Sequence, residues 1–137
     1  MNRSREHART LLRKARDDAW MLAQLIGKSE APDWGLGFHA QQAVEKAIKA
    51  VLSDRGVEFP RTHDLAELTE LARGAGVSEP PDGADLDLLT PYGAPVRYEV
   101  AADVGLERGL DRNWATGVVQ RTLSWAQDLL GTKGEGL

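Results

Sequence analysis

The sequence has 137 residues, of which 42% are hydrophobic and 28% charged, a balance typical of one folded domain and not of a disordered chain. It contains no cysteine, which excludes disulfides, thiolate metal sites and cysteine nucleophiles. The apolar runs are only a few residues long, so we predict neither a signal peptide nor a membrane span and expect a cytoplasmic protein.

The net charge of -4 is unevenly distributed along the chain. Residues 1–16 contain six basic residues and one acidic residue, while the remainder contains 11 basic and 20 acidic residues, so the two parts carry +5 and -9. The six basic residues are Arg3, Arg5, Arg9, Arg13, Lys14 and Arg16. A basic N-terminal segment on an otherwise acidic chain is a candidate contact for phosphate or RNA. Basic residues on the solvent-exposed face of a helix would give the same pattern.

The first predicted element is a helix from Ser4 to Ile26, because apolar residues recur there at three- and four-residue spacing on one face. Residues 27–37 contain glycine, serine and proline and are interpreted as a loop, with Gly35-Leu36-Gly37 as a turn. A second helix is predicted from Phe38 to Leu52, before a connector that includes the helix breaker Pro60.

The rest of the chain predicts three more helices. They run from Asp64 to about Arg73, from Asp85 to about Val100 with a kink or break near Pro91, and from about Glu107 to Leu130 with Gly131 as the cap. Residues 132–137 are expected to form a disordered tail. Since no segment alternates as a strand does, the predicted fold class is all-α, an up-and-down bundle of four to five antiparallel helices in one domain over residues 1–131.

The second predicted helix is apolar around most of its circumference. At about 100° per residue, Ala40, Ala43, Val44, Ala47 and Val51 share one sector, and Phe38, Ile48 and Leu52 share another. A polar ridge of His39, Gln42, Lys46 and Lys49 lies between the two sectors. Gln41 and Glu45 fall among the apolar residues, where an unpaired charge costs several kcal/mol, so both side chains need partners.

Two interpretations of this helix remain open. In the first, Gln41 and Glu45 pair with groups on other helices or across a dimer interface, and the polar ridge simply faces water. In the second, the polar ridge lines a cleft where His39 and Lys46 meet a phosphate or a base. Spacing alone does not distinguish them.

The segment from Phe38 to Leu52, FHAQQAVEKAIKAVL, closely resembles the signature helix of the HEPN domain family. Thr62-His63-Asp64-Leu65 resembles the family's opening of the next helix, and residues 88–92 followed by Arg97-Tyr98 resemble its later arginine-tyrosine segment. The resemblance covers about residues 5–130. It implies an all-α bundle, commonly dimeric and often encoded beside a small nucleotidyltransferase of the MNT type.

Members of this family are thought to bind nucleotides or RNA, and one branch consists of metal-independent ribonucleases that are frequently the toxin of a toxin-antitoxin pair. That branch has an arginine followed by a histidine with four to six residues between them. None of the three histidines, His7, His39 and His63, has an arginine at that distance before it. The resemblance therefore does not bring the ribonuclease chemistry with it, because cleavage without a metal needs both a base and a cation.

The leading hypothesis is a non-catalytic nucleotide- or RNA-binding domain that acts with a partner, either an MNT-type nucleotidyltransferase or the other half of a toxin-antitoxin system. The predicted nucleotide- or phosphate-binding residues are His39, Gln42, Lys46, Lys49, His63, Tyr92, Arg97 and Tyr98. One alternative is a divergent ribonuclease that uses His63 or His39 with Arg97. Another is an interaction module in which Gln41 and Glu45 mediate dimerisation. No catalytic residue, metal or cofactor is predicted.

Overall fold

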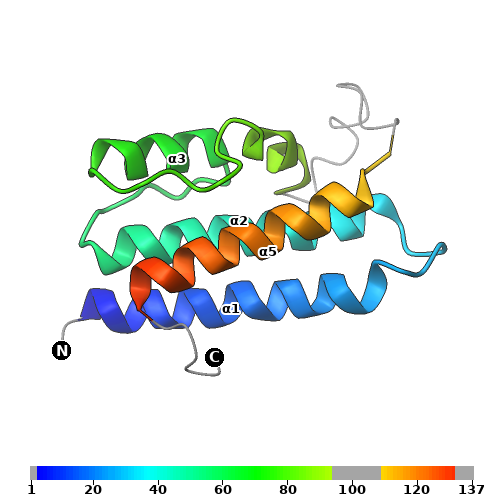
Figure 1. Cartoon of the computed structure of the whole chain (residues 1–137), viewed down its shortest axis with the longest axis horizontal. Coiled ribbons are helices and arrows are strands. Elements are labelled where there is room, and N and C mark those ends of the chain that lie inside the picture. Colours follow the sequence, from blue (N-terminus) through cyan, green and yellow to red (C-terminus); the bar gives the residue numbers. More distant parts are fainter. Residues whose placement is uncertain (1–2, 94–108, 132–137) are drawn as a thin grey trace.

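The computed structural model describes residues 3–93 and 109–131, and within these ranges every regular element is helical, so the all-α prediction is confirmed. The elements are α1 (Arg3–Leu25), α2 (Asp33–Asp54), α3 (Leu65–Gly74), the 3-10 helix η1 (Leu86–Gly93) and α5 (Arg112–Leu130) (Figure 1). Arg97, Tyr98 and the predicted tail at 132–137 lie outside the described residues. None of the described helices is both long and apolar enough to cross a membrane.

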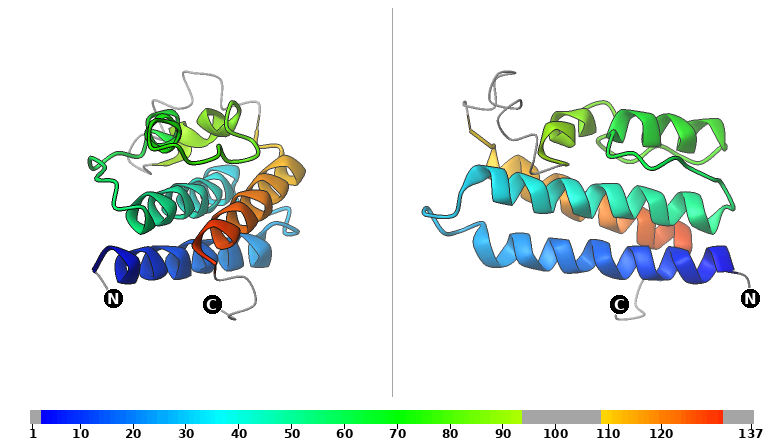
Figure 2. Two further views of the ribbon diagram at one scale, coloured as in Figure 1. Left: turned by 60° about the vertical axis from the view of Figure 1, so that its left-hand side comes forward. Right: turned by 180° about the vertical axis from the view of Figure 1, so that it is seen from behind.

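Three long helices form the body of the molecule, and α3 and η1 cover α2 on the side away from α1 (Figures 1 and 2). The Ser53 hydroxyl donates to the Ser4 carbonyl at 2.7 Å, which places the end of α2 beside the start of α1. α1 is therefore antiparallel to α2. In contrast, α5 runs in the same direction as α2 (Figure 1), so this pair differs from the antiparallel order predicted for the bundle.

α2 is the central helix of this arrangement, and it contacts each of the other four elements. Of its 22 residues, 13 are buried. This position explains the two apolar sectors predicted for it, because a helix with neighbours on several sides buries most of its circumference.

α2 begins at Asp33, so the prediction of a loop up to Gly37 and a turn at Gly35-Leu36-Gly37 was wrong. A tertiary contact explains why Gly37 is accommodated within the helix. The ring of Tyr92 packs directly against the helix at Gly37, where a Cβ atom would overlap the ring. This packing offsets the cost of about 1 kcal/mol that a glycine brings to a helix interior.

Two other boundaries differ from the prediction. The first half of the kinked helix expected from Asp85 to about Val100 is the eight-residue 3-10 helix η1, which contains Pro91, and residues 94–100 lie outside the described residues. Proline disrupts the α-helical hydrogen-bond pattern, whereas short 3-10 helices have a different one. α5 begins at Arg112 and not near Glu107, because the Asp111 carboxylate caps it by accepting from the Trp114 N–H at 3.0 Å. The predicted cap at Gly131 is confirmed by its left-handed φ of 71°.

Candidate functional site

The polar ridge of α2 lies over two buried carboxylates, Asp18 of α1 and Glu45 of α2 itself. Each of its four residues, His39, Gln42, Lys46 and Lys49, is partly exposed. The two carboxylates are only 5% and 4% exposed. Charged groups of opposite sign are thus arranged in two levels, with the carboxylates beneath and the basic groups at the rim.

Asp18 binds two ridge residues at once. Lys46 Nζ donates to Asp18 Oδ2 at 2.6 Å, and His39 Nδ1 lies 3.0 Å from Oδ1. We did not predict Asp18 as a site residue. A signal was present, because Asp18 is three residues after Ala15 and four before Leu22, which places a carboxylate in the buried stripe of α1.

Glu45 lies at the centre of a second group, the Glu45 cluster, which comprises Gln41, Gln42, Glu45, Lys49 and His63. Gln41 Nε2 donates to Glu45 Oε1 at 2.8 Å and to the His63 carbonyl at 3.1 Å. Lys49 Nζ donates to Glu45 Oε2 at 2.9 Å, and His63 Nδ1 is 2.8 Å from Oε1. Gln42 Nε2 donates to Gln41 Oε1 at 2.8 Å.

The partners that Gln41 and Glu45 require therefore come from their own chain. Gln41 is fully buried and Glu45 is 4% exposed within a single copy. Because the chain itself covers both side chains, little of either is left to contact a second copy, as the hypothesis of an interaction module requires.

The surroundings of Glu45 favour its charged form. Burial alone would raise the pKa of its carboxyl, but hydrogen bonds from Gln41, Lys49 and His63, together with the charge of Lys49, hold this pKa below the ordinary value of 4.5. Glu45 is thus ionised at neutral pH and fixes the positions of Lys49 and His63.

The two histidines of the site have a common geometry. Each directs Nδ1 to a carboxylate, and Nε2 is the nitrogen that remains for another partner. The His63 side chain is 58% exposed and the His39 side chain 22% exposed. His63 lies just before α3, where its carbonyl is held by Gln41. The structure thus brings His63 to the ridge although 17 residues separate it from Glu45 in sequence.

The remaining predicted residues are placed differently. Tyr92 is 8% exposed, and its ring packs against Gly37. Its burial, and then the charge of Asp33, raise the pKa of its hydroxyl. Tyr92 is thus part of the core that supports the start of α2. Arg97 and Tyr98 lie outside the described residues, in the gap that follows Gly93, and Gly93 itself lies beside Gln41.

An open groove of about 660 Å³ lies at the opposite end of α2. It is lined by Arg3, Ser4, His7, Ser53, Gly56, Val57, Glu58 and Phe59, none of which was a predicted site residue. Phe59 connects the groove with the Glu45 cluster, because Lys49 Nζ lies 5.6 Å from the centre of its ring. Within residues 3–93 and 109–131, no three carboxylates or histidines gather as a metal site requires.

The HEPN domain family model matches residues 8–131, which include nearly all of α1 and the whole of every later helix. The chain belongs to the HEPN domain family. No curated protein and no solved structure matches it. In this HEPN domain the signature segment of α2 supplies both the central core helix and the polar ridge, which explains why its pattern is readable in the sequence.

Proposed function

We propose that this HEPN domain binds a nucleotide or RNA through the polar ridge of α2 together with His63. One observation carries the proposal: four groups able to bear positive charge, His39, Lys46, Lys49 and His63, surround only two buried carboxylates. The two lysines balance the two carboxylates, so the polar ridge does not repel an anion, and its lysines present hydrogen-bond donors to one.

The hydrogen-bonding capacity of the site fits a phosphate group. A lysine ammonium has three donors, and the contacts of Lys46 and Lys49 with the carboxylates use one donor each. The Nε2 atoms of His39 and His63 are also not used in the carboxylate contacts, and each becomes a donor to a phosphate when its imidazole is protonated. Because the two carboxylates offset part of the positive charge, we expect modest and salt-sensitive binding.

The test uses two substitutions with opposite effects on the same group of charges. Lys46→Gln removes a cation from the ridge and should weaken the binding of ATP and of a short single-stranded RNA about fivefold in calorimetric titrations at fixed low salt. Asp18→Asn removes the carboxylate beneath and should strengthen both by a similar factor. A misfolded variant cannot bind more tightly, so the gain separates a binding role from a structural one.

Asp82→Asn is the matched control, because it also removes one carboxylate that pairs with a basic residue. Asp82 is partly exposed and pairs with Arg121 on another part of the surface. It should leave the affinity within about twofold of the original value. Equal affinities of all variants, or equal gains from Asp18→Asn and Asp82→Asn, would show that the ridge is not the binding site.

The family resemblance supports a homodimer that acts with an MNT-type nucleotidyltransferase, in a toxin-antitoxin system or outside one. Light scattering of the purified chain should then give the mass of two copies. Adding such a nucleotidyltransferase should produce a larger complex. A monomer whose mass is unchanged by the enzyme would contradict this part of the proposal.

A second candidate function, a divergent ribonuclease, is favoured by the Glu45–His63 contact. A carboxylate that holds Nδ1 orients the imidazole so that Nε2 can take a proton from a ribose 2′-hydroxyl. This activity predicts RNA cleavage and growth arrest on expression, both lost in His63→Ala. Intact RNA after prolonged incubation with the original protein would rule it out.

A further inference from the structure

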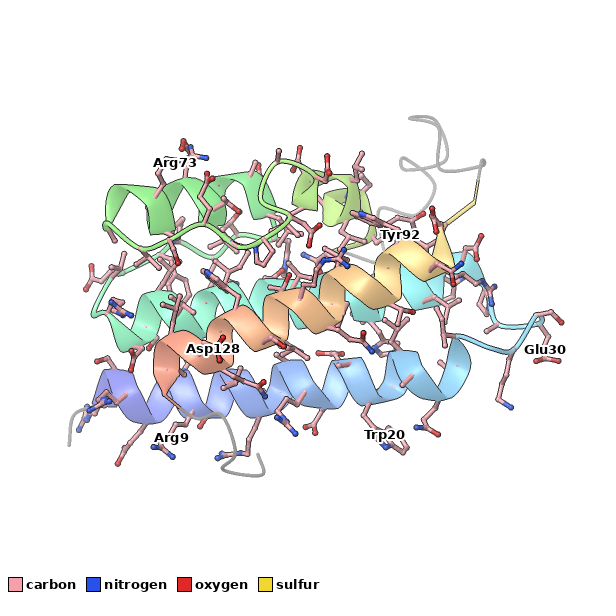
Figure 3. All side chains as sticks on the ribbon, in the orientation of Figure 1. Arg9, Trp20, Glu30, Arg73, Tyr92 and Asp128 are labelled. Atoms are coloured by element: carbon pink, nitrogen blue, oxygen red, sulfur yellow. The ribbon has the colours of Figure 1, made fainter. Side chains whose placement is uncertain are left out.

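The outer face of α1 has a basic and aromatic surface that is separate from the polar ridge. Arg5, Arg9, Arg13, Arg16 and Trp20 follow one another at spacings of four, four, three and four residues, and we call them the α1 stripe. At about 100° per residue they occupy a narrow sector of the helix, roughly opposite Asp18. Figure 3 shows Arg9 and Trp20 extending from α1 away from the other helices.

Trp20 is the most informative member of the α1 stripe. It is 64% exposed, although a tryptophan is usually well covered. The buried face of α1 is formed by Ala8, Leu12, Ala15 and Leu22, so Trp20 is not needed for packing against the bundle. An isolated exposed aromatic residue carries little meaning, but here the aromatic ring continues a row of arginines.

The charge distribution favours an anionic partner at this face. The segment up to residue 16 carries +5 and the rest of the chain -9, so a polyanion is repelled by the body and attracted to α1. Arg5 also approaches Asp54 at 3.5 Å, but its side chain remains 62% exposed. Glu6 and Asp17 lie at one edge of the α1 stripe and leave its centre basic.

We propose that the α1 stripe binds single-stranded RNA, with the arginines on phosphates and a base stacked on Trp20. The stripe extends for about 22 Å along the helix, given a rise of about 1.5 Å per residue. Stacking on an aromatic ring requires an unpaired base, whose faces are hidden in a duplex. A lipid surface fits less well, because the apolar face of α1 is buried in the bundle.

This inference rests on the RNA-related part of the proposed function and adds to the polar ridge a second RNA contact, on the other face of α1. The probe is a fluorescein-labelled single-stranded oligouridine of about 12 nucleotides, titrated with the full chain and followed by anisotropy. Trp20→Ala should weaken binding about tenfold. The double change Arg9→Gln with Arg13→Gln should lower the slope of log affinity against log salt by about 1.4, since each phosphate contact contributes about 0.7.

Two controls match these variants. Trp34→Ala removes another exposed tryptophan, 43% accessible, at the start of α2. Arg73→Gln removes an exposed arginine of α3, on the far side of the molecule from α1 (Figure 3). Neither control should change the affinity more than about twofold, and circular dichroism should show the same helix content in all variants.

The outcomes separate the α1 stripe from the polar ridge. If Trp20→Ala and the double arginine variant bind the oligouridine as the original protein does, the inference is overturned, even where Lys46→Gln weakens ATP binding. If polyglutamate binds as tightly and depends equally on Trp20, the stripe recognises acidic protein and the RNA assignment is also overturned. Equal affinity for a duplex of the same length would contradict the stacking role of Trp20.

Discussion

At the scale of single residues, each of the two buried carboxylates organises several neighbours. Asp18 holds Lys46 and His39, and Glu45 holds Lys49 and His63. A buried carboxylate without such partners would be protonated or destabilising, whereas the hydrogen bonds to Glu45 favour its charged form. The positions of the basic side chains at the rim therefore depend on residues that lie beneath them.

Glu45→Gln should destabilise the fold. The substitution keeps the shape of the side chain but removes the charge that pairs with Lys49 and accepts from Gln41 and His63, and we expect a loss of about 2 kcal/mol at neutral pH. Urea denaturation followed by circular dichroism gives this free energy of unfolding. Glu70→Gln, which removes an exposed partner of Arg73, is the control and should change it by less than about 0.5 kcal/mol.

The stability lost in Glu45→Gln should depend on pH. The folded-state pKa of Glu45 is lower than its unfolded value, so its charge stabilises the native state above the ordinary pKa of 4.5, and this contribution is lost as the pH falls through the folded-state pKa. The difference in stability between the original protein and Glu45→Gln should be largest at neutral pH and shrink in acid below pH 4.5. A constant difference over this range would show that the charge of Glu45 is not stabilising.

At the scale of elements, the approach of η1 to α2 depends on two glycines. Gly37 accommodates the ring of Tyr92, and Gly93 lies beside Gln41, where a Cβ atom would be 2.9 Å from the Gln41 Cδ atom. The end of η1 is thus packed against the same helix that carries the polar ridge. This contact couples the position of η1 to the Glu45 cluster through Gln41.

Gly37→Ala and Gly35→Ala form a matched pair on α2. Both gain helix propensity, about 1 kcal/mol at an interior position. At Gly35 the new methyl group meets only Pro32, at 3.7 Å, so this variant should be slightly more stable. At Gly37 it overlaps Tyr92, and we expect a net loss of about 2 kcal/mol.

Thermal unfolding of the two glycine variants should therefore show changes of opposite sign. Because Tyr92 must move in Gly37→Ala, its hydroxyl should also become more accessible, and its raised pKa should return toward the ordinary value of 10.0. If Gly37→Ala proves as stable as Gly35→Ala, the packing of η1 on α2 described above is incorrect.

A second contact between elements involves Arg112, the first residue of α5. Its guanidinium donates to the carbonyls of Lys28 at 2.9 Å and Ala31 at 2.7 Å and pairs with Asp33 at 3.1 Å. These hydrogen bonds connect the α1–α2 loop with the start of α5. They also explain why α2 and α5 begin at the same end of the molecule.

At the scale of the whole molecule, the helical class and the central role of α2 were predictable, because three- and four-residue spacing reports which faces are buried. The two apolar sectors around the polar ridge already implied neighbours on more than one side. The burial of Gln41 and Glu45 followed from the same angles. Asp18 was also readable in principle, as a charge within an apolar stripe.

The features that the sequence did not predict depend on contacts between distant segments. The ring that packs against Gly37 in the first turns of α2 belongs to Tyr92, which is 55 residues after Gly37 in sequence. The contacts of Arg112 bridge 79 to 86 residues. Local helix propensity contains no information on such pairs of distant residues. The sequence alone also does not distinguish a glycine that permits close packing from a glycine in a turn.

The binding of an anionic ligand to the polar ridge is tested most directly by following the histidine side chains. The chain has only three histidines, and they mark two places: His39 and His63 belong to the site, whereas His7 lines the groove at the other end of α2. In an NMR titration of protein labelled with ¹⁵N-histidine, ATP should shift the imidazole signals of His39 and His63 and leave that of His7 in place. A shift of His7 alone, or no shift of any histidine at saturating ATP, would contradict the proposed site.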